Sequence, residues 1–509
     1  MVFNIAIFAL SVAAFVLSGF KLLRIAQREH YIPGYVSRFY IRWLKLPENF
    51  MFFLLSVLLT AGSFFYRPLV IAALVLIAFM PLGMSFFGES SLLKFTRRAT
   101  FTFAVSLVVF LIVALLLYKL KAQSDYFANM VAPGIFDFSL FILNPVEKKL
   151  SYKYVKSAQE KLKKVNPTVI AITGSYGKTT IKNMLALILS SRYEVYASPA
   201  SYNNELGLAR AINEGLTLST KFFIAEMGTY KIGEIAQMCS WIKPEFSAIS
   251  QIAPVHLERF KKLENTVKAK AEIAQSAKAV VLNVDNPYLM PLCQVFEDQG
   301  KKVIKVSENK DVEADVKACV VSVSGATQIL EITAFQNEPA FLRVDSSVSA
   351  INLAIAIGLA SLCELSIQEI ISACSKLSSV EHRLNTYTSN SGYLIIDDTY
   401  NSNPSGAKKA LRFGLDLLAP NGTLVVVTPG MVELGPIQFE ENKKLAEFIK
   451  HNNADLVIVG HVNKKALKAG YPDAKWVPKR KDAIKLLKDY PEISKLVVLF
   501  ENDLPDHYP

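Results

Sequence analysis

Charged residues are missing from four long stretches in the first quarter of this 509-residue chain. Residues 2–20, 51–66, 69–88 and 101–118 contain no Asp, Glu, Lys or Arg. A helix of about 20 apolar residues crosses a bilayer, and fewer suffice when flanking side chains reach the interface. We interpret the four stretches as membrane helices, because a small soluble core would not readily bury all of them. Buried core helices are the alternative.

Features of a secretory signal peptide are also missing. No small-residue cleavage site follows the first apolar stretch, and Lys21, Arg24 and Arg28 come after it rather than before it. The loop 21–49 is rich in Lys and Arg, which favours a cytoplasmic position. We therefore predict that the N-terminus lies outside the membrane and that the first apolar stretch is retained.

The charge pattern of the later loops raises a problem of parity. Loop 89–100 is basic and should face the cytoplasm, so a fourth crossing at 101–118 would place the rest of the chain outside. Residues 127–146 are apolar except for Asp137 and are interrupted by Pro133-Gly134. We predict that this segment returns to the cytoplasm as a fifth, broken or re-entrant element.

Cysteine is scarce, and no nucleic-acid-binding signature is present. The five cysteines show no CxxC or zinc-ligand spacing, as expected for buried thiols in a reducing cytoplasm. The net charge of +12 comes from dispersed Lys and Arg, part of which serves membrane topology and contact with anionic lipid. We therefore expect a lipid bilayer, and no nucleic acid, as a partner.

A phosphate-binding loop follows the apolar region. The β-branched run 169–173 leads into a turn with Gly174 and Gly177, and a helix is expected to begin near Thr179. Backbone N–H groups of such a turn and the helix N-terminus bind phosphate, Lys178 can reach a terminal phosphate, and the Thr179 hydroxyl can bind Mg²⁺. The usual spacing requires glycine where Ile172 stands, so this loop is a shorter variant.

Strands and helices alternate after residue 168, which predicts a mostly parallel sheet with helices on both faces. Residues 302–345 are richer in β-like runs and are expected to form an antiparallel edge. A second, smaller Rossmann-like α/β unit is expected from Asn385 onward. The predicted domains are an α-helical membrane region (1–146), an amphipathic linker helix (147–167), a P-loop-type ATP-binding α/β domain (168–384) and a C-terminal Rossmann-like α/β domain (385–509).

Nine short motifs occur in a fixed order along residues 150–440. The first six are Gly-Ser-Tyr-Gly-Lys-Thr-Thr (174–180), Tyr-Asn-Asn-Glu-Leu-Gly (202–207), Glu226-Met-Gly, His256-Leu-Glu, Lys270-Ala-Glu-Ile and Asn283-Val-Asp285. The last three are His382-Arg383-Leu384, Asp397-Asp398-Thr-Tyr-Asn-Ser-Asn-Pro404 and Thr428-Pro-Gly-Met-Val-Glu-Leu-Gly435. The ordered set resembles the Mur ligases, the ATP-dependent amide-forming enzymes of peptidoglycan synthesis, and most of all the branch that adds D-alanyl-D-alanine.

The resemblance implies a catalytic centre in which ATP activates a carboxylate as an acyl phosphate. Lys178, Glu226, His256 and Lys270 would be catalytic. Thr179 and Glu226 offer oxygen ligands for Mg²⁺, and the resemblance implies that His256 helps to hold a second ion. It also implies that Lys270 is carbamylated by CO₂, which converts a cation into an anionic oxygen donor.

The resemblance also implies contacts with nucleotide and substrates. The predicted nucleotide contacts are Gly174, Ser175, Gly177, Lys178, Thr179, Thr180, Asn352, Arg383 and Asp398. The predicted contacts with the carboxylate substrate are Asn203 and Asn204, and those with the incoming amine are Tyr400, Asn401 and Asn403.

Simpler structural roles remain open for several of these residues. Glu226 could be a surface acid at the end of a strand. His256 could be an imidazole with a structural role. Lys270 is also explained as an exposed helix lysine, and Lys268 is close enough to confuse the assignment. Asn-Ser-Asn-Pro (401–404) is in addition a favourable turn sequence.

The sequence departs from the family pattern at three places. The Gly-x-His-Asn that precedes the adenine-binding helix corresponds here to Ser346-Ser-Val-Ser-Ala-Ile-Asn352, in which Asn352 alone is kept. The end of the chain reads Leu499-Phe-Glu-Asn-Asp-Leu-Pro505 instead of a lysine-glycine-serine-arginine type. The apolar helices occupy the place of the UDP-binding N-terminal domain.

The leading hypothesis is therefore a membrane-anchored ligase in the cytoplasmic membrane with its catalytic domains in the cytoplasm. It would join D-alanyl-D-alanine, or another amino acid or dipeptide, to a muropeptide-type carboxylate that is UDP- or lipid-linked. A synthase of γ-linked amino-acid polymers is one alternative. A membrane NTPase for transport or signalling is another, and a degenerate ligase that acts as a scaffold is a third. The sequence does not indicate an oligomeric state.

Overall fold

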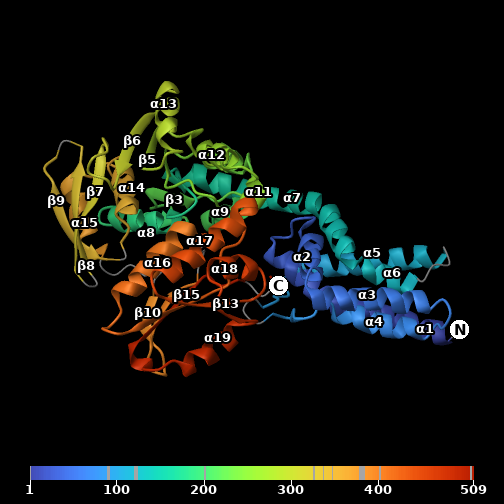
Figure 1. The fold of residues 1–509 in the computed structure, drawn as a ribbon. Helices are drawn as coiled ribbons and strands as arrows, with labels where there is room; N and C mark the ends of the chain where they lie inside the picture. The colour runs from blue at the N-terminus through green and yellow to red at the C-terminus, as the bar shows by residue number, and fades with distance from the viewer. Residues whose placement is uncertain are drawn as a thin grey trace.

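The computed structural model describes residues 2–88, 92–119, 124–199, 202–324, 327–335, 337–346, 348–377, 385–399, 403–504 and 507–509. An elongated helical bundle projects from two α/β domains (Figure 1). The N-terminus lies at the far end of the bundle, and the C-terminus lies where the bundle meets the α/β domains.

The bundle helices run back and forth along one axis (Figure 1). They are α1 (Val2–Arg28), α3 (Pro47–Gly62), α4 (Leu69–Phe79), α5 (Arg97–Lys119) and α6 (Ser124–Met130), with α2 (Tyr35–Leu44) at the end nearest the α/β domains. By length and composition, α1 and α5 each suffice to cross a membrane, and α2 with α3, bent by 98°, would make a third span.

Helix α4 is shorter than the sequence suggested. The uncharged stretch 69–88 is helical only as far as Phe79, and these 11 residues measure about 16 Å, roughly half of a hydrocarbon core of about 30 Å. Pro81 follows two residues later, and proline cannot continue a helix because it lacks the N–H donor.

Helix α7 (Ala132–Val165) connects the bundle to the α/β domains. The break expected at Pro133-Gly134 lies at Val131, between α6 and α7, because proline suits the first turn of a helix. The expected boundary at residue 146 falls inside α7, so one continuous helix carries both the fifth apolar element and the linker. Its last turns place Val155, Ala158 and Leu162 in the core of the first α/β domain.

Asp137, the single acidic residue in the fifth apolar element, caps helix α2. Its carboxylate accepts hydrogen bonds from the backbone N–H groups of Gly34, Val36 and Ser37 at 2.7, 3.2 and 2.9 Å. A carboxylate at a helix N-terminus satisfies N–H groups that have no partner within the helix and complements the helix dipole. The polar residue that interrupts the apolar pattern therefore has a structural role.

The first α/β domain contains a nine-stranded sheet in the order β2-β3-β1-β4-β5-β6-β7-β8-β9. The strands are β1 (Thr168–Thr173), β2 (Val195–Ala197), β3 (Phe222–Glu226), β4 (Phe246–Ile249), β5 (Ala279–Asn283), β6 (Lys302–Ser307), β7 (Val316–Ser324), β8 (Thr327–Ala334) and β9 (Ala340–Asp345). Pairing is parallel from β2 to β7 and antiparallel from β7 to β9, which confirms the predicted antiparallel edge. The central position of β1 brings its carboxyl end beside those of β3 and β4.

Helices cover both faces of this sheet. On one face α8 (Lys178–Leu189), α14 (Ala350–Ala360) and α15 (Ile367–Cys374) pack into one apolar core. On the other, α9 (Glu205–Gly215), α10 (Glu234–Ile242) and α13 (Met290–Asp298) pack with the end of α7. The short helices α11 (Leu257–Phe260) and α12 (Leu263–Ala271) lie between β4 and β5 in the chain.

The C-terminal domain has a six-stranded sheet in the order β10-β11-β15-β12-β13-β14. The strands are β10 (Asn385–Thr388), β11 (Leu394–Asp398), β12 (Thr423–Thr428), β13 (Asp455–Val459), β14 (Lys475–Val477) and β15 (Leu496–Glu501), and the helices are α16 (Pro404–Asp416), α17 (Gln438–His451), α18 (Lys464–Gly470) and α19 (Arg480–Leu486). All neighbours are parallel except β10 and β11. The last strand in the chain, β15, is inserted in the middle of the sheet.

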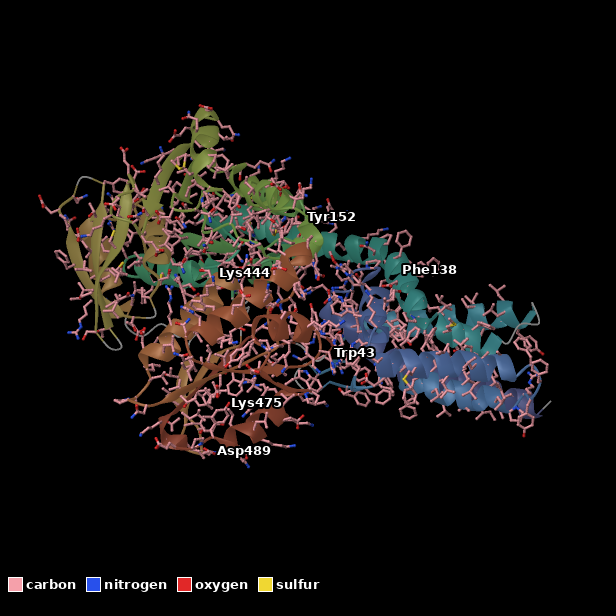
Figure 2. All side chains as sticks on the ribbon, in the orientation of Figure 1. Trp43, Phe138, Tyr152, Lys444, Lys475 and Asp489 are labelled. Atoms are coloured by element: carbon pink, nitrogen blue, oxygen red, sulfur yellow. The ribbon has the colours of Figure 1, made fainter. Side chains whose placement is uncertain are left out.

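The last residues of the chain pack against the bundle. Trp43, labelled at the junction in Figure 2, donates from its indole N–H to the His507 carbonyl oxygen at 2.9 Å. His507 Nε2 lies 3.2 Å from a carboxylate oxygen of Glu29 at the end of α1, and the ring of Tyr508 meets that of Phe39 edge-on. The C-terminal domain is thereby fastened to the helical bundle.

Candidate active site

The phosphate loop has the predicted strand–turn–helix form, with helix α8 beginning at Lys178, one residue earlier than expected. Gly174 has φ +149° and Gly177 φ +82°, conformations that residues with a Cβ rarely adopt. A Cβ on Gly174 would lie 1.8 Å from the Ser250 hydroxyl oxygen, and one on Gly177 would lie 2.5 Å from Oδ1 of Asn352. Glycine is therefore required at both positions.

The segment after β4 holds this loop in place. The Ser175 N–H donates to the Gln251 carbonyl at 2.7 Å, and the Ser175 hydroxyl donates to the Ala253 carbonyl at 3.1 Å. The Ser250 hydroxyl donates to the Tyr176 carbonyl. The loop is thus tied to the segment that leads directly to His256.

Two of the predicted catalytic lysines meet at one backbone oxygen. Lys178 Nζ and Lys270 Nζ donate to the Gly174 carbonyl at 2.8 and 3.0 Å. Lys270, on α12, is buried, whereas Lys268 is exposed, so the interpretation of Lys270 as an exposed helix lysine was wrong. Burial, together with the nearby charge of Lys178, holds the pKa of Lys270 well below its usual value.

Glu226, at the end of β3, is 2% exposed and is not a surface acid. Its Oε2 accepts from the Thr179 hydroxyl at 2.9 Å, and its Oε1 accepts from the Asn203 amide at 3.2 Å. Three predicted site residues from β3, α8 and the loop before α9 are therefore brought together beside the phosphate loop.

Lys182 is a further member of this cluster that the sequence analysis missed. Its Nζ lies 3.2 Å from Oε2 of Glu226, and each side chain is only 3% exposed. Lys182 lies one helical turn after Lys178, among the apolar residues of α8. Its position among apolar helix residues was the signal by which the sequence could have indicated Lys182, because a buried charge requires a partner.

His256 lies at the boundary between the two α/β domains. Its Nδ1 contacts a carboxylate oxygen of Glu433 from the loop after β12, and its ring meets that of Tyr230 edge-on. Burial disfavours the charged form of Glu433, but the His256 hydrogen bond and the charges of His256, Arg259 and Arg42 outweigh it and lower the pKa of Glu433. This contact supports a structural role for His256, and metal binding by His256 stays a prediction.

The side chains of Thr179 and Glu226 are the candidate ligands for a divalent cation at the phosphate loop. Across the described residues, no group of three or more His, Cys, Asp or Glu side chains lies close enough to hold a metal ion. The Thr179 hydroxyl and the Glu226 carboxylate do form a pair of hard oxygen ligands at the phosphate loop. Because Mg²⁺ is usually bound by one or two protein oxygens together with substrate phosphates, these residues fit a nucleotide-bound ion.

The remaining predicted residues have different positions. Asn352, on α14, lies against Gly177 of the phosphate loop, as expected for a nucleotide contact. Asn204 caps α9 by accepting from the Gly207 N–H at 2.8 Å, and Asn403 caps α16 by accepting from the Gly406 N–H at 2.7 Å. Both asparagines thus have a structural task, and their contact with substrate stays a prediction.

Of the other nucleotide and amine contacts, Thr180 lies in the first turn of α8 and Asp398 ends β11, and both are half-buried. Arg383, Tyr400 and Asn401 lie outside the described residues.

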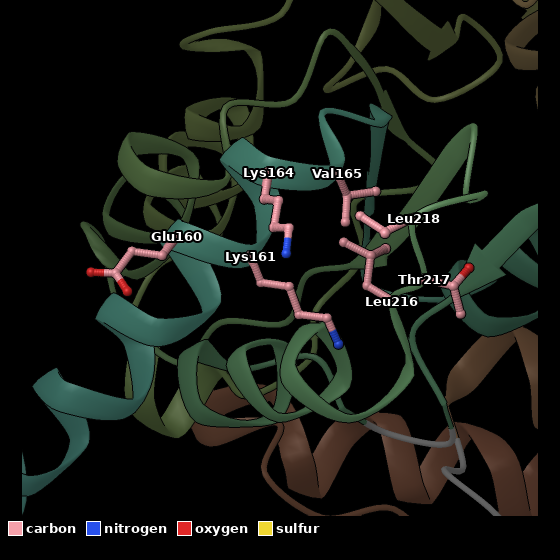
Figure 3. Close-up of a pocket in the computed structure, with 7 residues that line it drawn as sticks. All are labelled: Glu160, Lys161, Lys164, Val165, Leu216, Thr217 and Leu218. Carbon is pink, nitrogen blue, oxygen red and sulfur yellow. The ribbon is translucent and has the colours of Figure 1, made fainter.

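A separate cavity of about 490 Å³ lies between the end of α7 and the loop after α9 (Figure 3). Lys161, Lys164 and Leu216 are among the residues that line it, and none of the predicted site residues does so. The candidate site is therefore the region around the phosphate loop, at the carboxyl ends of β1, β3 and β4, where open α/β sheets bind ligands.

Fold and site together define a two-domain α/β protein built around a phosphate-binding loop. The family model of the Mur ligase middle domain matches residues 172–360, and that of the Mur ligase glutamate ligase domain matches residues 382–500. Since the two matches cover more than half of the chain, the chain belongs to the Mur ligase family.

Curated relatives to which the chain is similar include proteins named UDP-N-acetylmuramoyl-tripeptide–D-alanyl-D-alanine ligase. That of Mycobacterium bovis is 30% identical in an alignment of length 309 that covers 58% of this chain and 58% of the relative. That of Bacillus subtilis is 25% identical in an alignment of length 305 that covers 59% of this chain and 64% of the relative. The chain thus spans less than two thirds of the length of these relatives.

Solved structures show the same fold. MurF from Acinetobacter baumannii superposes with a TM-score of 0.61 at 22% identity, over 69% of this chain and 77% of that chain. The MurF ligase from Thermotoga maritima, in complex with ADP, gives a TM-score of 0.58 at 24% identity, over 69% and 80%.

Proposed function

We propose that this protein is an ATP-dependent, ADP-forming ligase that joins a muropeptide-type carboxylate to an amine in peptidoglycan synthesis. One observation carries the proposal. Lys178 and Lys270 meet at the Gly174 carbonyl, next to the hydrogen-bonded pair of Thr179 and the buried Glu226. Positive charge, backbone N–H groups and oxygen ligands at one helix N-terminus suit phosphoryl transfer.

Each residue of this cluster has a separate task. Bound ATP supplies the phosphoryl group that activates the carboxylate, and Mg²⁺ neutralises negative charge during the transfer. Loop N–H groups and Lys178 hold the phosphates, while Thr179 and Glu226 hold the ion. Lys182 and Asn203 orient the Glu226 carboxylate through their contacts with its two oxygens.

Lys270 is suited to carbamylation. Its lowered pKa leaves a larger share of the amine neutral, and the neutral amine is the form that reacts with CO₂. The nitrogen lone pair forms a bond to carbon, one proton leaves, and the product is a carbamate anion. This anion would place an oxygen donor close to the phosphate loop.

The amine substrate is proposed to enter from the C-terminal domain. The His256–Glu433 contact joins the two α/β domains, and Asp398 and Asn403 lie on the C-terminal side. D-alanyl-D-alanine is the amine in the names of the relatives. We propose the same dipeptide here.

We further propose that the bundle is embedded in the cytoplasmic membrane, with the α/β domains in the cytoplasm. Apolar side chains on the outside of the bundle support this position. The exposed fraction is between 54% and 66% for each of Phe50, Leu58, Leu115, Phe138 and Phe141. Phe138 is labelled on α7 in Figure 2. A carboxylate substrate carried by a lipid would then reach the site from the inner leaflet.

The test is a reaction of the detergent-solubilised full chain with ATP, D-alanyl-D-alanine and either UDP-linked or undecaprenyl-linked muramoyl tripeptide. ADP and one amide product should form only when both carboxylate and amine are present. ATP turnover that does not depend on either substrate would instead indicate a membrane NTPase. A product that lengthens with time would indicate a polymer synthase.

A further inference from the structure

Helix α2 has one buried face and one basic face. Val36, Phe39 and Trp43 are buried. The opposite face lines a groove of about 520 Å³ with residues spaced three or four apart, so that they form one stripe along the helix. The lining residues are Gly34, Ser37, Arg38, Ile41, Arg42 and Lys45.

Helix α2, whose residues line this basic groove, lies where the bundle meets the α/β domains (Figure 1). Lys45 is two residues before Pro47, the first residue of α3, and α3 exposes Phe50, Leu54 and Leu58. If these apolar side chains face lipid, the groove lies at the level of the phosphate head groups on the cytoplasmic side.

Two arginines of the groove contact the segment of the chain that carries His256. Arg38 Nη2 and Arg42 Nη2 each lie 2.7 Å from Oε2 of Glu258, on the short helix α11. Glu258 is two residues beyond His256, and Arg42 is among the charges that lower the pKa of Glu433. The same two arginines thus face both the groove and the boundary between the two α/β domains.

The charges of the groove suit an anionic ligand. Three cations, Arg38, Arg42 and Lys45, are opposed by the carboxylate of Glu258 and by that of Asp137, which accepts from the N–H groups of Gly34 and Ser37, and this leaves a net charge of about +1. Each guanidinium carries five N–H donors. The contact with Glu258 is made through one terminal nitrogen of each guanidinium. Paired arginines are well suited to phosphate oxygens, because the planar fork matches their geometry.

We propose that the basic groove on α2 binds the diphosphate of the carboxylate substrate and directs its peptide toward the phosphate loop. The proposal rests on the proposed ligase function. The diphosphate is the feature that a UDP-linked and a polyprenyl-linked muropeptide share, and the position of the groove beside α3 favours the lipid-linked form.

Steady-state kinetics of the full chain test this proposal. The variants are Arg42→Gln, Lys45→Gln and Glu258→Gln, with Lys149→Gln as control, because Lys149 is an exposed lysine on α7 outside the groove. Each is assayed with undecaprenyl-diphosphate-linked muramoyl tripeptide, with UDP-linked muramoyl tripeptide, and with a muramoyl tripeptide that carries no diphosphate.

Arg42→Gln and Lys45→Gln should raise KM for the diphosphate-linked substrate about tenfold and leave its kcat within about twofold. Neither should change KM for the diphosphate-free substrate, and Lys149→Gln should behave like the wild type. Glu258→Gln should lower KM for the diphosphate-linked substrate, since it removes the opposing negative charge. A rise in KM for the lipid-linked substrate alone would identify the lipid-linked diphosphate as the ligand, and a rise for both would identify the shared diphosphate.

An unchanged KM for both diphosphate-linked substrates in an active ligase would overturn the groove assignment. So would an equal loss with the diphosphate-free substrate. The failure of the proposed function looks different, because then no variant and no wild-type protein would form ADP with any of the three carboxylates.

Discussion

Lys182 and Glu226 form an ion pair at 3.2 Å inside the first α/β domain, with each side chain only 3% exposed. The same carboxylate accepts from Thr179, so the pair connects the stability of the domain to the position of a proposed Mg²⁺ ligand.

Replacing Lys182 with Met should destabilise the protein strongly, because it leaves Glu226 buried with less compensation. The expected loss is about 3 kcal/mol, or about 6–12 °C in the unfolding midpoint of a domain of this size. Lys485→Met is the matched control, since Lys485 lies 3.1 Å from Asp482 but is 73% exposed. That change should cost less than about 1 kcal/mol. Equal effects of the two substitutions in thermal unfolding would contradict the prediction.

Substituting Gly174 with Ala should weaken nucleotide binding. Its Cβ would lie 1.8 Å from the Ser250 hydroxyl at a φ that alanine rarely adopts. We expect ATP affinity to fall more than about tenfold, corresponding to about 1.4 kcal/mol or more. Gly300→Ala is the control, because Gly300 also has a positive φ (+75°) but has no atom within 4 Å of the added Cβ. It should retain ATP binding, as measured by calorimetry or by a fluorescent analogue.

Lys270, and not Lys268, should carry the carbamate. After equilibration with ¹³C-bicarbonate, a carbamate carbon signal should appear in the NMR spectrum of the wild type and of Lys268→Ala. It should be absent from Lys270→Ala. The lowered pKa of Lys270 should keep the signal present to lower pH than for an ordinary surface lysine, because less of the amine is protonated. Lys270→Ala should also lose ligase activity and recover part of it with short carboxylic acids.

Glu433 should contribute stability that depends on pH. Because the folded-state pKa of Glu433 lies below the value of 4.5 for an unperturbed glutamate, its contribution is complete above pH 4.5. It is lost as the pH falls through the folded-state pKa. The difference in unfolding midpoint between the wild type and Glu433→Gln should therefore shrink as the pH is lowered below 4.5.

The proposed orientation can be tested by labelling introduced cysteines in membrane vesicles of known sidedness. All five native cysteines are buried, and burial raises the pKa of Cys239, Cys363 and Cys374 to about 12, so they should react slowly with maleimides. A membrane-impermeant maleimide should label Arg67→Cys from the outside and Lys278→Cys only from the cytoplasmic side. Labelling of both from the same side would contradict the proposed topology.

Much of the α/β fold could be predicted from local sequence patterns. The β-branched run 169–173 before the phosphate loop is observed as β1 (Thr168–Thr173), because a continuous β-branched run before a glycine turn is a local signal. The short strands β10 and β14 were missed. Each has only three or four residues and is stabilised by its neighbours in the sheet rather than by its own pattern.

The helical region shows where local patterns were insufficient. Uncharged stretches predicted the apolar helices, but the early end of α4 and the continuity of α7 depend on packing and on single prolines. Asp137 stood out in the sequence as a polar residue in an apolar element. Its function as the cap of α2, about 100 residues earlier in the chain, required the three-dimensional arrangement.

By itself, the sequence determined the phosphate loop, the order of the motifs and the alternation of strands and helices, because spacing along the chain encodes local backbone geometry. Only the tertiary structure decided that Lys182 neutralises Glu226, that Glu433 reaches His256 from the other domain, and that α2 presents its arginines to Glu258. Such pairs join distant parts of the chain, and their partners are selected by burial and charge in the folded state.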